Sequence, residues 1–197
     1  MKEDRLATET HSRSTYENAQ IGTDAMTSSL PNDDTFRRLL FHTAALAMAC
    51  DGEVHPDEIR ELKLVARHTK YFSGLNLEAE IATFFRVLED NKHAALELYF
   101  KELASAALDP VRELQVLEVA LRMIYADHKV VENEEKFCRL IRKSLRVPKP
   151  ILERRFGPVP FLDIGAWGGK DLDTKEVAGL ADGFLVPMPG EFYELDP

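Results

Sequence analysis

Apolar side chains recur at spacings of three and four residues between residues 35 and 147, which is the period of amphipathic α-helices. The pattern predicts six successive helices, and no alternation of apolar and polar residues in this stretch predicts a strand. Residues 33–35 would cap the first helix, Asp109 and Pro110 would begin the fifth, and Asp90-Asn91 would separate the third from the fourth. The residues predicted to face the core are Phe36, Leu39, Leu40, Thr43, Ala47, Cys50, Ile59, Leu62, Val65, Ala66, Ile81, Phe84, Phe85, Leu88, Ala95, Leu98, Tyr99, Leu103, Leu114, Leu117, Leu121, Ile124, Phe137, Leu140, Ile141 and Leu145.

The composition changes at both ends of this helical stretch. Residues 1–34 are polar and acidic, and they predict a disordered arm that cannot bury enough apolar surface to offset its ordering entropy. Seven of the ten prolines and seven of the ten glycines fall in residues 148–197, which predict one short helix over 151–156 and otherwise an irregular extension. Its aromatic residues would either pack on the bundle or contact a partner. We therefore expect an all-α bundle of about six to seven helices over residues 35–147, flanked by the arm and by the extension.

The net charge of −9 is carried mainly by the flanks. Residues 1–34 contain 3 basic and 7 acidic side chains, and residues 148–197 contain 5 and 9. This distribution argues against wholesale nucleic-acid binding. Neither Cys50 nor Cys138 has metal-ligand spacing, so both are expected as buried free thiols in a reducing compartment. With no signal peptide and no apolar run of about 18 residues, the expected location is the cytoplasm.

Two segments of the helical stretch repeat one acidic signature. In each, an apolar helix ends at an Asp, a Val follows three residues later, and a Glu follows seven residues later. Asp51 and Glu58 in the first segment therefore correspond to Asp127 and Glu134 in the second. The repeat indicates an internal duplication that gives two related helical hairpins.

This signature, Asp-Gly-x-Val-x-x-x-Glu after an apolar helix, resembles that of the bacterial tellurite-resistance TerB-like family. The resemblance covers roughly residues 35–147. It implies an all-helical fold of two related hairpins, whose acidic positions are thought to form a divalent-metal site. The same kind of domain also occurs attached to the J-domains of membrane-anchored co-chaperones. The second hairpin departs from the pattern, because His128 replaces the turn glycine and Lys129 follows it. His128 must then adopt an unusual turn conformation, and Lys129 could neutralise part of the acidic cluster.

The helix dipole supports the metal hypothesis independently of the resemblance. Asp51 and Asp127 follow helix C-termini, where the macrodipole disfavours anions by about 0.3–1 kcal/mol. The same unfavourable placement at two related positions suggests compensation by a cation such as Ca²⁺, Mg²⁺ or Mn²⁺. The predicted metal ligands are Asp51, Glu58, Asp127 and Glu134, with Asp57, Glu132 or Asn133 as additional ligands. The alternative is that these acids cap turns and pair with nearby Arg or Lys.

A basic stripe runs from Lys136 to Arg155, with eight cations against one acid, Glu153. Such a stripe could dock on an acidic partner or an anionic lipid surface. The side chains predicted to make this contact are Arg139, Arg142, Lys143 and Arg146. Two alternatives remain open: a solvated helix face, or an internal contact in which the acidic tail folds back onto the stripe. The tail residues in question are Asp171, Asp173, Glu176 and Asp182.

The functional hypothesis is a non-catalytic module of a tellurite-resistance or stress-response system, as the resemblance implies. It would hold a divalent cation and signal to a protein partner, in peripheral contact with a membrane surface. The alternative is a metal-independent scaffold that uses the basic stripe and the aromatic tail. A metal-dependent hydrolase is the weakest option, because no nucleophile or general-base constellation accompanies the carboxylates. No motif identifies a small-molecule substrate or a nucleic-acid site.

Overall fold

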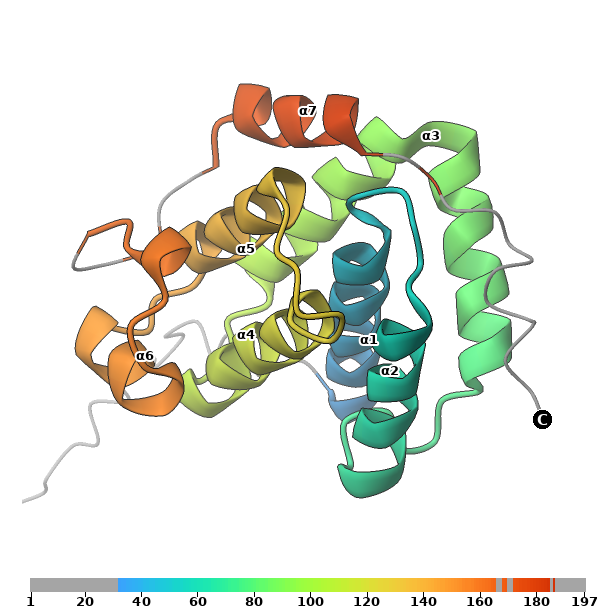
Figure 1. Ribbon diagram of the computed structural model, residues 1–197, viewed down its shortest axis with the longest axis horizontal. Coiled ribbons are helices and arrows are strands. Elements are labelled where there is room, and N and C mark those ends of the chain that lie inside the picture. The colour runs from blue at the N-terminus through green and yellow to red at the C-terminus, as the bar shows by residue number, and fades with distance from the viewer. Residues whose placement is uncertain (1–31, 166–167, 170–171, 185, 187–197) are drawn as a thin grey trace, which may run out of the picture.

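The computed structural model describes residues 32–165, 168–169, 172–184 and 186, and every regular element within them is a helix (Figure 1). No β-strand occurs in these ranges, which confirms the predicted all-α class. The predicted arm, residues 1–34, lies outside the described residues except for its last three. The elements are α1 (Asp33–Ala49), α2 (Pro56–His68), α3 (Leu77–Ser105), α4 (Pro110–Ile124), α5 (Glu132–Ser144), α6 (Lys149–Phe156), the 3-10 helix η1 (Pro160–Leu162) and α7 (Thr174–Gly183).

Side-chain caps set the helix starts. Asp109 Oδ1 accepts hydrogen bonds from Val111 N at 2.8 Å and Arg112 N at 2.9 Å, as predicted for the start of α4. Helix α1 is capped instead by Asn32, whose Oδ1 accepts from Thr35 N at 2.7 Å. The helix therefore begins at Asp33, earlier than the predicted domain start, because the extended residue that can reach the free N–H groups is Asn32.

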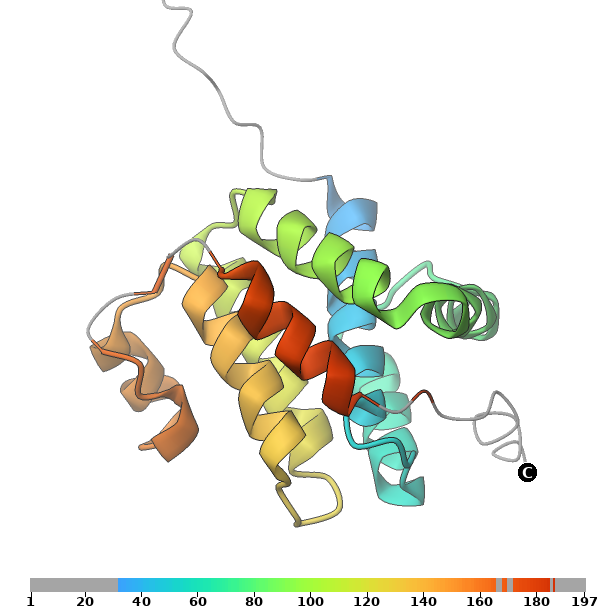
Figure 2. The ribbon, with the colours of Figure 1, turned by 90° about the horizontal axis from the view of Figure 1, so that it is seen from above.

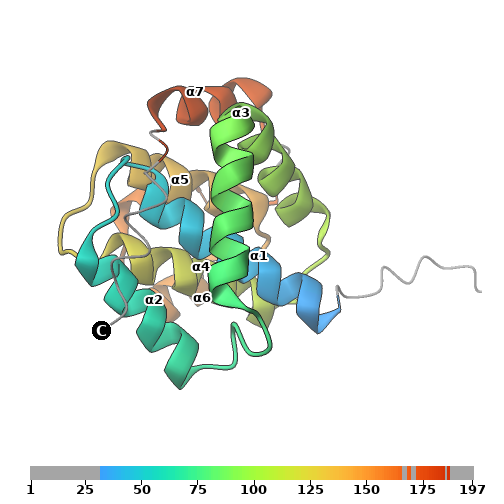
Figure 3. The ribbon, with the colours of Figure 1, turned by 90° about the vertical axis from the view of Figure 1, so that its right-hand side faces the viewer.

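Helix α1 is the centre of the bundle and contacts α3, α4 and α5 (Figures 1 and 3). It is buried on all sides from Ala44 to Cys50, as expected for a helix that is apolar all round. The alanines in this segment leave room for α4 to pack closely. All the predicted core residues lie in or against the core except Leu98, which is 53% exposed. The buried stripe there is Leu96, Tyr99 and Leu103, so Leu98 faces away from it.

Helix α3 consists of two arms that point in different directions (Figures 2 and 3). Its backbone leaves the helical region at Asn91, with φ −158° and ψ 90°. The Asn91 side chain then accepts a hydrogen bond from Ala94 N at 3.0 Å and caps the second arm. The predicted break at Asp90-Asn91 is thus a bend rather than a loop. The second arm lies against α7.

The C-terminal extension is more ordered than the sequence predicted. Helix α7 packs on α3 and α5 (Figures 1 and 2), and Ala181-Asp182-Gly183 forms its last turn. The prediction of an irregular extension is therefore wrong over residues 174–183. Helix α7 buries Val177, Leu180 and Ala181, and Phe184 behind it is fully buried. None of the helices in the described ranges is both long enough and apolar enough to cross a membrane.

We expect Phe184→Ala to lower the free energy of unfolding by about 3–5 kcal/mol, the usual cost of truncating a fully buried phenylalanine. Leu98→Ala is the matched control, because Leu98 is 53% exposed and its truncation should cost less than about 0.5 kcal/mol. Denaturant unfolding of the full chain measures both. Equal, small effects of the two changes would show that the extension does not belong to the folded unit.

Candidate metal centre

The two acidic turns lie on the same side of the molecule, one between α1 and α2 and the other between α4 and α5 (Figures 1 and 3). One side chain links them directly. Asn133 Nδ2 donates to the carbonyl oxygen of Cys50 at 3.2 Å and to that of Gly183 at 2.5 Å. Cys50 precedes Asp51 and Asn133 precedes Glu134, so this amide holds the first turn of α5 against the end of α1.

The two turns have the same local geometry. Gly52 has φ 88° and His128 has φ 65°, so the unusual turn conformation predicted for His128 is the left-handed one that Gly52 adopts in the first turn. Asp51 Oδ1 accepts a hydrogen bond from Glu53 N at 3.0 Å, and Asp127 Oδ1 accepts one from Lys129 N at 2.8 Å. Each aspartate therefore closes its turn by accepting a hydrogen bond from the backbone N–H two residues later.

The two glutamates also repeat one arrangement. Glu58 Oε2 accepts a hydrogen bond from His55 N at 2.8 Å, and Glu134 Oε2 accepts one from Val131 N at 2.7 Å. Each is the third residue of its helix and reaches back to the residue before the helix, as in a capping box. Each is only 4% exposed. The duplication thus fixes one buried carboxylate and one turn carboxylate per hairpin.

The four carboxylates are close enough to interact electrostatically in every pairwise combination. Burial, assisted by the charges of Asp51, Glu134 and Asp127, raises the pKa of Glu58 to about 9 against the opposing effect of the backbone hydrogen bond. Burial likewise raises the pKa of Glu134 to about 7, with Asp51 and Asp127 adding to the shift. Burial also raises the pKa of Asp51.

No lysine or arginine in the described ranges forms an ion pair with any of these four side chains. Lys129, which could have neutralised the cluster, is exposed and makes no such pair. Within the same ranges, no group of three or more His, Cys, Asp or Glu side chains has the arrangement of a ready-made metal site. The cluster therefore consists of four carboxyl groups whose oxygens are held by turn and cap hydrogen bonds, and its two buried glutamates ionise less readily than exposed ones.

The three predicted additional ligands bond elsewhere. Asp57 pairs with Arg60 on the surface of α2, and Glu132 pairs with Lys136 at 2.8 Å. Asn133 uses its amide nitrogen for the two carbonyls described above. The thiols of Cys50 and Cys138 are free and buried, as predicted, and burial raises the pKa of both. The chemistry of the cluster is that of hard carboxylate oxygens, which suits Ca²⁺, Mg²⁺ or Mn²⁺.

The basic stripe is placed differently from the prediction at one position. Arg139 and Arg146 are exposed, but the side chain of Arg142 is fully buried and cannot reach a partner in this conformation. Arg142 belongs to the inner stripe of α5, one turn after Cys138 and beside Ile141, and burial lowers the pKa of its guanidinium. Lys143 forms an ion pair with Glu176 of α7. The internal contact between the acidic tail and the stripe is thus formed at Glu176, whereas Asp171 lies outside the described residues.

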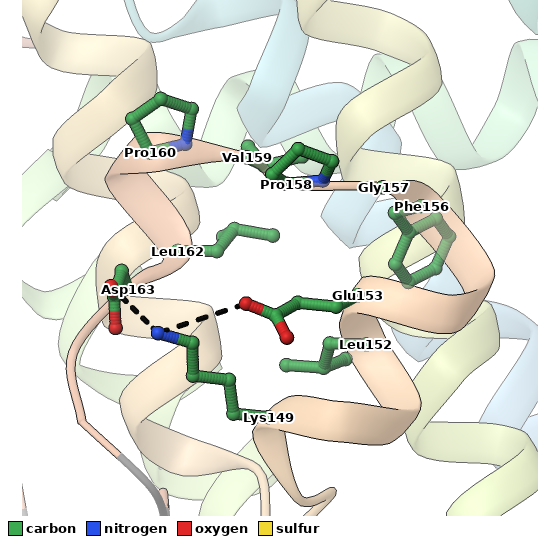
Figure 4. A pocket seen from close by; sticks show the side chains of 10 residues that line it. All are labelled: Lys149, Leu152, Glu153, Phe156, Gly157, Pro158, Val159, Pro160, Leu162 and Asp163. Carbon is green, nitrogen blue, oxygen red and sulfur yellow. Dashed lines mark hydrogen bonds and ion pairs between the residues drawn. The ribbon is translucent and has the colours of Figure 1, made fainter.

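A separate cavity of about 100 Å³ lies between α6 and η1 (Figure 4). Its one cation, Lys149, lies between Asp163 at 2.8 Å and Glu153 at 3.7 Å. The remaining wall is mainly apolar side chains and prolines. Because both of its carboxylates are paired with Lys149, this cavity offers no unpaired nucleophile or general base.

Comparison with known proteins identifies the family of the helical stretch. A family model described as Tellurite resistance protein TerB matches residues 37–154, which extend from α1 into α6. No curated protein and no solved structure matches the chain. The matched range includes both acidic turns and covers more than half of the sequence, while α7 lies beyond it. TerB domains are in general non-catalytic. The chain belongs to the TerB family of tellurite-resistance proteins.

Proposed function

We propose that this chain is a non-catalytic module of a tellurite-resistance or stress-response system that binds a divalent cation at the paired acidic turns and signals to a protein partner. The ligands would be Asp51, Glu58, Asp127 and Glu134. The observation that supports this proposal is the grouping of four carboxyl groups from duplicated turns, with no basic side chain paired to them among the residues that the structure describes. Uncompensated negative charge of this kind favours cation binding.

The physical gain from a cation would come from relieving two separate costs. Glu58 and Glu134 are buried, so their ionised forms are disfavoured by desolvation, and the four carboxyl groups repel one another when they ionise. A divalent cation would offset both costs at once. Because Ca²⁺ takes about six to eight oxygens and Mg²⁺ takes six, water and backbone carbonyls would complete the shell.

A metal-independent scaffold is the second candidate, and the hydrogen bonds favour it. Each glutamate already caps a helix and each aspartate already closes a turn, so these residues have structural roles without any ion. The two candidates differ in one measurable property. The first requires saturable cation binding at the cluster, and the second requires none.

We expect titration calorimetry of the full chain with Ca²⁺, Mg²⁺ or Mn²⁺ to give saturable heats, with a rise in melting temperature in excess cation. At a cation concentration 100 times the dissociation constant, the added stability would be about 2.7 kcal/mol. The variant Asp51→Asn/Asp127→Asn should lose both effects, because it removes two charges while each Oδ1 can still accept its turn hydrogen bond.

Glu97→Gln is the matched control for this titration, because Glu97 is an exposed residue of α3 outside the cluster. It should bind the cation as the parent chain does. Identical heats and identical melting shifts for the parent and the double variant would leave the scaffold as the better account.

We expect the cation-free protein to lose stability as the pH rises. Glu58 has an ordinary pKa of 4.5 that burial raises to about 9 in the folded protein, and that of Glu134 rises to about 7. The folded state therefore holds these protons more tightly than the unfolded state, so their stabilising effect is complete below the ordinary pKa and is lost as the pH rises through the folded values.

Thermal unfolding in the presence of a chelator, measured from about pH 5 to about pH 9, checks this dependence. Glu58→Gln should flatten the slope, since the amide oxygen can still accept from His55 N but carries no titrating proton. Glu97→Gln should keep the slope of the parent chain. A Glu58→Gln variant with an unchanged slope would contradict the assignment of the pH dependence to this carboxyl.

A further inference from the structure

A basic groove lies between α5 and α7, on a part of the molecule that is distinct from the acidic turns. The two helices lie side by side (Figures 1 and 2), and the groove encloses about 230 Å³. Buried Leu140 and Leu180 form its apolar floor. Its cationic walls come from both helices and consist of Lys136, Arg139, Lys143 and Lys175.

The charge of the groove is opposite to that of the chain. Four cations line it and its single acid, Glu176, is already paired with Lys143, whereas the chain as a whole carries −9. Arg139 and Lys175 are exposed and have no acidic partner in the described ranges. Two cations facing one groove without counter-charges create a local field that attracts an anionic ligand.

The spacing of the cations indicates an elongated ligand. Lys136, Arg139 and Lys143 occupy one face of α5 and extend over about 10 Å of helix, at 1.5 Å per residue. A single small anion cannot contact both ends of such a row. An extended peptide with acidic side chains can do so, and an apolar side chain between them would lie over Leu140 and Leu180.

Gly179 leaves one wall of the groove without a side chain. It is an interior residue of α7, where glycine costs about 1 kcal/mol relative to alanine. A Cβ atom at this position would meet nothing within 4 Å, so no packing against the described residues requires a glycine. The absent side chain leaves the groove wall open where a ligand backbone could lie.

The surroundings favour a peptide over a membrane. The groove is concave, and Asp173 and Asp182 at the two ends of α7 are exposed acids that an anionic bilayer would also meet. A peptide can enter between the helices and avoid these charges. Because α7 lies beyond the matched TerB range, this groove is formed by the extension of this chain.

We propose that the groove between α5 and α7 binds an acidic peptide segment of a partner protein, whose carboxylates pair with Arg139 and Lys175. This site does not rest on cation binding at the acidic turns. The partner would bind in this groove, through ion pairs to its carboxylates and an apolar contact with the groove floor.

Fluorescence anisotropy of the full chain with a labelled peptide of Asp and Glu around one central Leu tests the proposal. The control peptide has the same sequence with Asn in place of Asp and Gln in place of Glu. We expect the acidic peptide to bind and Arg139→Glu/Lys175→Glu to weaken binding on the order of tenfold or more. Arg86→Glu/Lys101→Glu, which reverses two exposed charges on α3, is the control with the same net charge and should bind as the parent chain does.

A steric variant and a chelator complete the test. Gly179→Leu should weaken binding without lowering the melting temperature, because the added side chain fills the groove rather than the core. Binding should persist in a chelator and in Asp51→Asn/Asp127→Asn, which separates this site from the cation site. Equal binding of the neutral peptide, equal losses in both charge-reversal variants, or binding to phosphatidylserine vesicles but not to the peptide would each overturn the proposal.

Discussion

The side-chain amide of Asn133 is the contact on which the arrangement of this molecule depends. Its nitrogen donates to carbonyls at the end of α1 and at the end of α7, which are 83 and 50 residues away in the sequence. A Cβ atom at Gly183 would lie 2.7 Å from the Asn133 amide nitrogen, so a larger residue there would displace this side chain. One amide therefore fixes the first hairpin, the second hairpin and the extension relative to one another.

This contact helps to hold like charges together. Two buried glutamates and two turn aspartates would separate if the hairpins could move apart, but α1 packs against both α4 and α5 within the core. The backbone hydrogen bonds to Glu58 and Glu134 reduce the cost of their burial without removing it. The electrostatic cost at the turns is thus offset by apolar packing elsewhere in the bundle.

Local signals in the sequence were sufficient for most of the helices and for the pairing of the two turns. Asp109-Pro110 begins a helix as predicted, and the repeat alone matches Asp51 with Asp127. Helix α7 was missed because the glycines and prolines around it dominate the composition, although Asp173 caps it and Val177, Leu180 and Ala181 follow helical spacing. Arg142 was predicted to lie on the surface because it is charged, although its position in the sequence falls on the apolar stripe of α5. The bonds of Asn133 were beyond sequence reasoning, because no local pattern encodes partners that distant.

The bend at Asn91 sets the directions in which the side chains of the second arm of α3 point. Directly after the bend, Lys92 Nζ donates to the carbonyl of Phe184 at 2.7 Å and His93 lies 3.4 Å from Asp182. One residue inserted or deleted in the first arm, between Phe85 and Leu88, would turn these two core side chains by about 100° relative to each other. The same change just after the bend would turn Lys92 and His93 by a similar angle relative to Asn91. Evolutionary variation in length is therefore disruptive in both arms of α3.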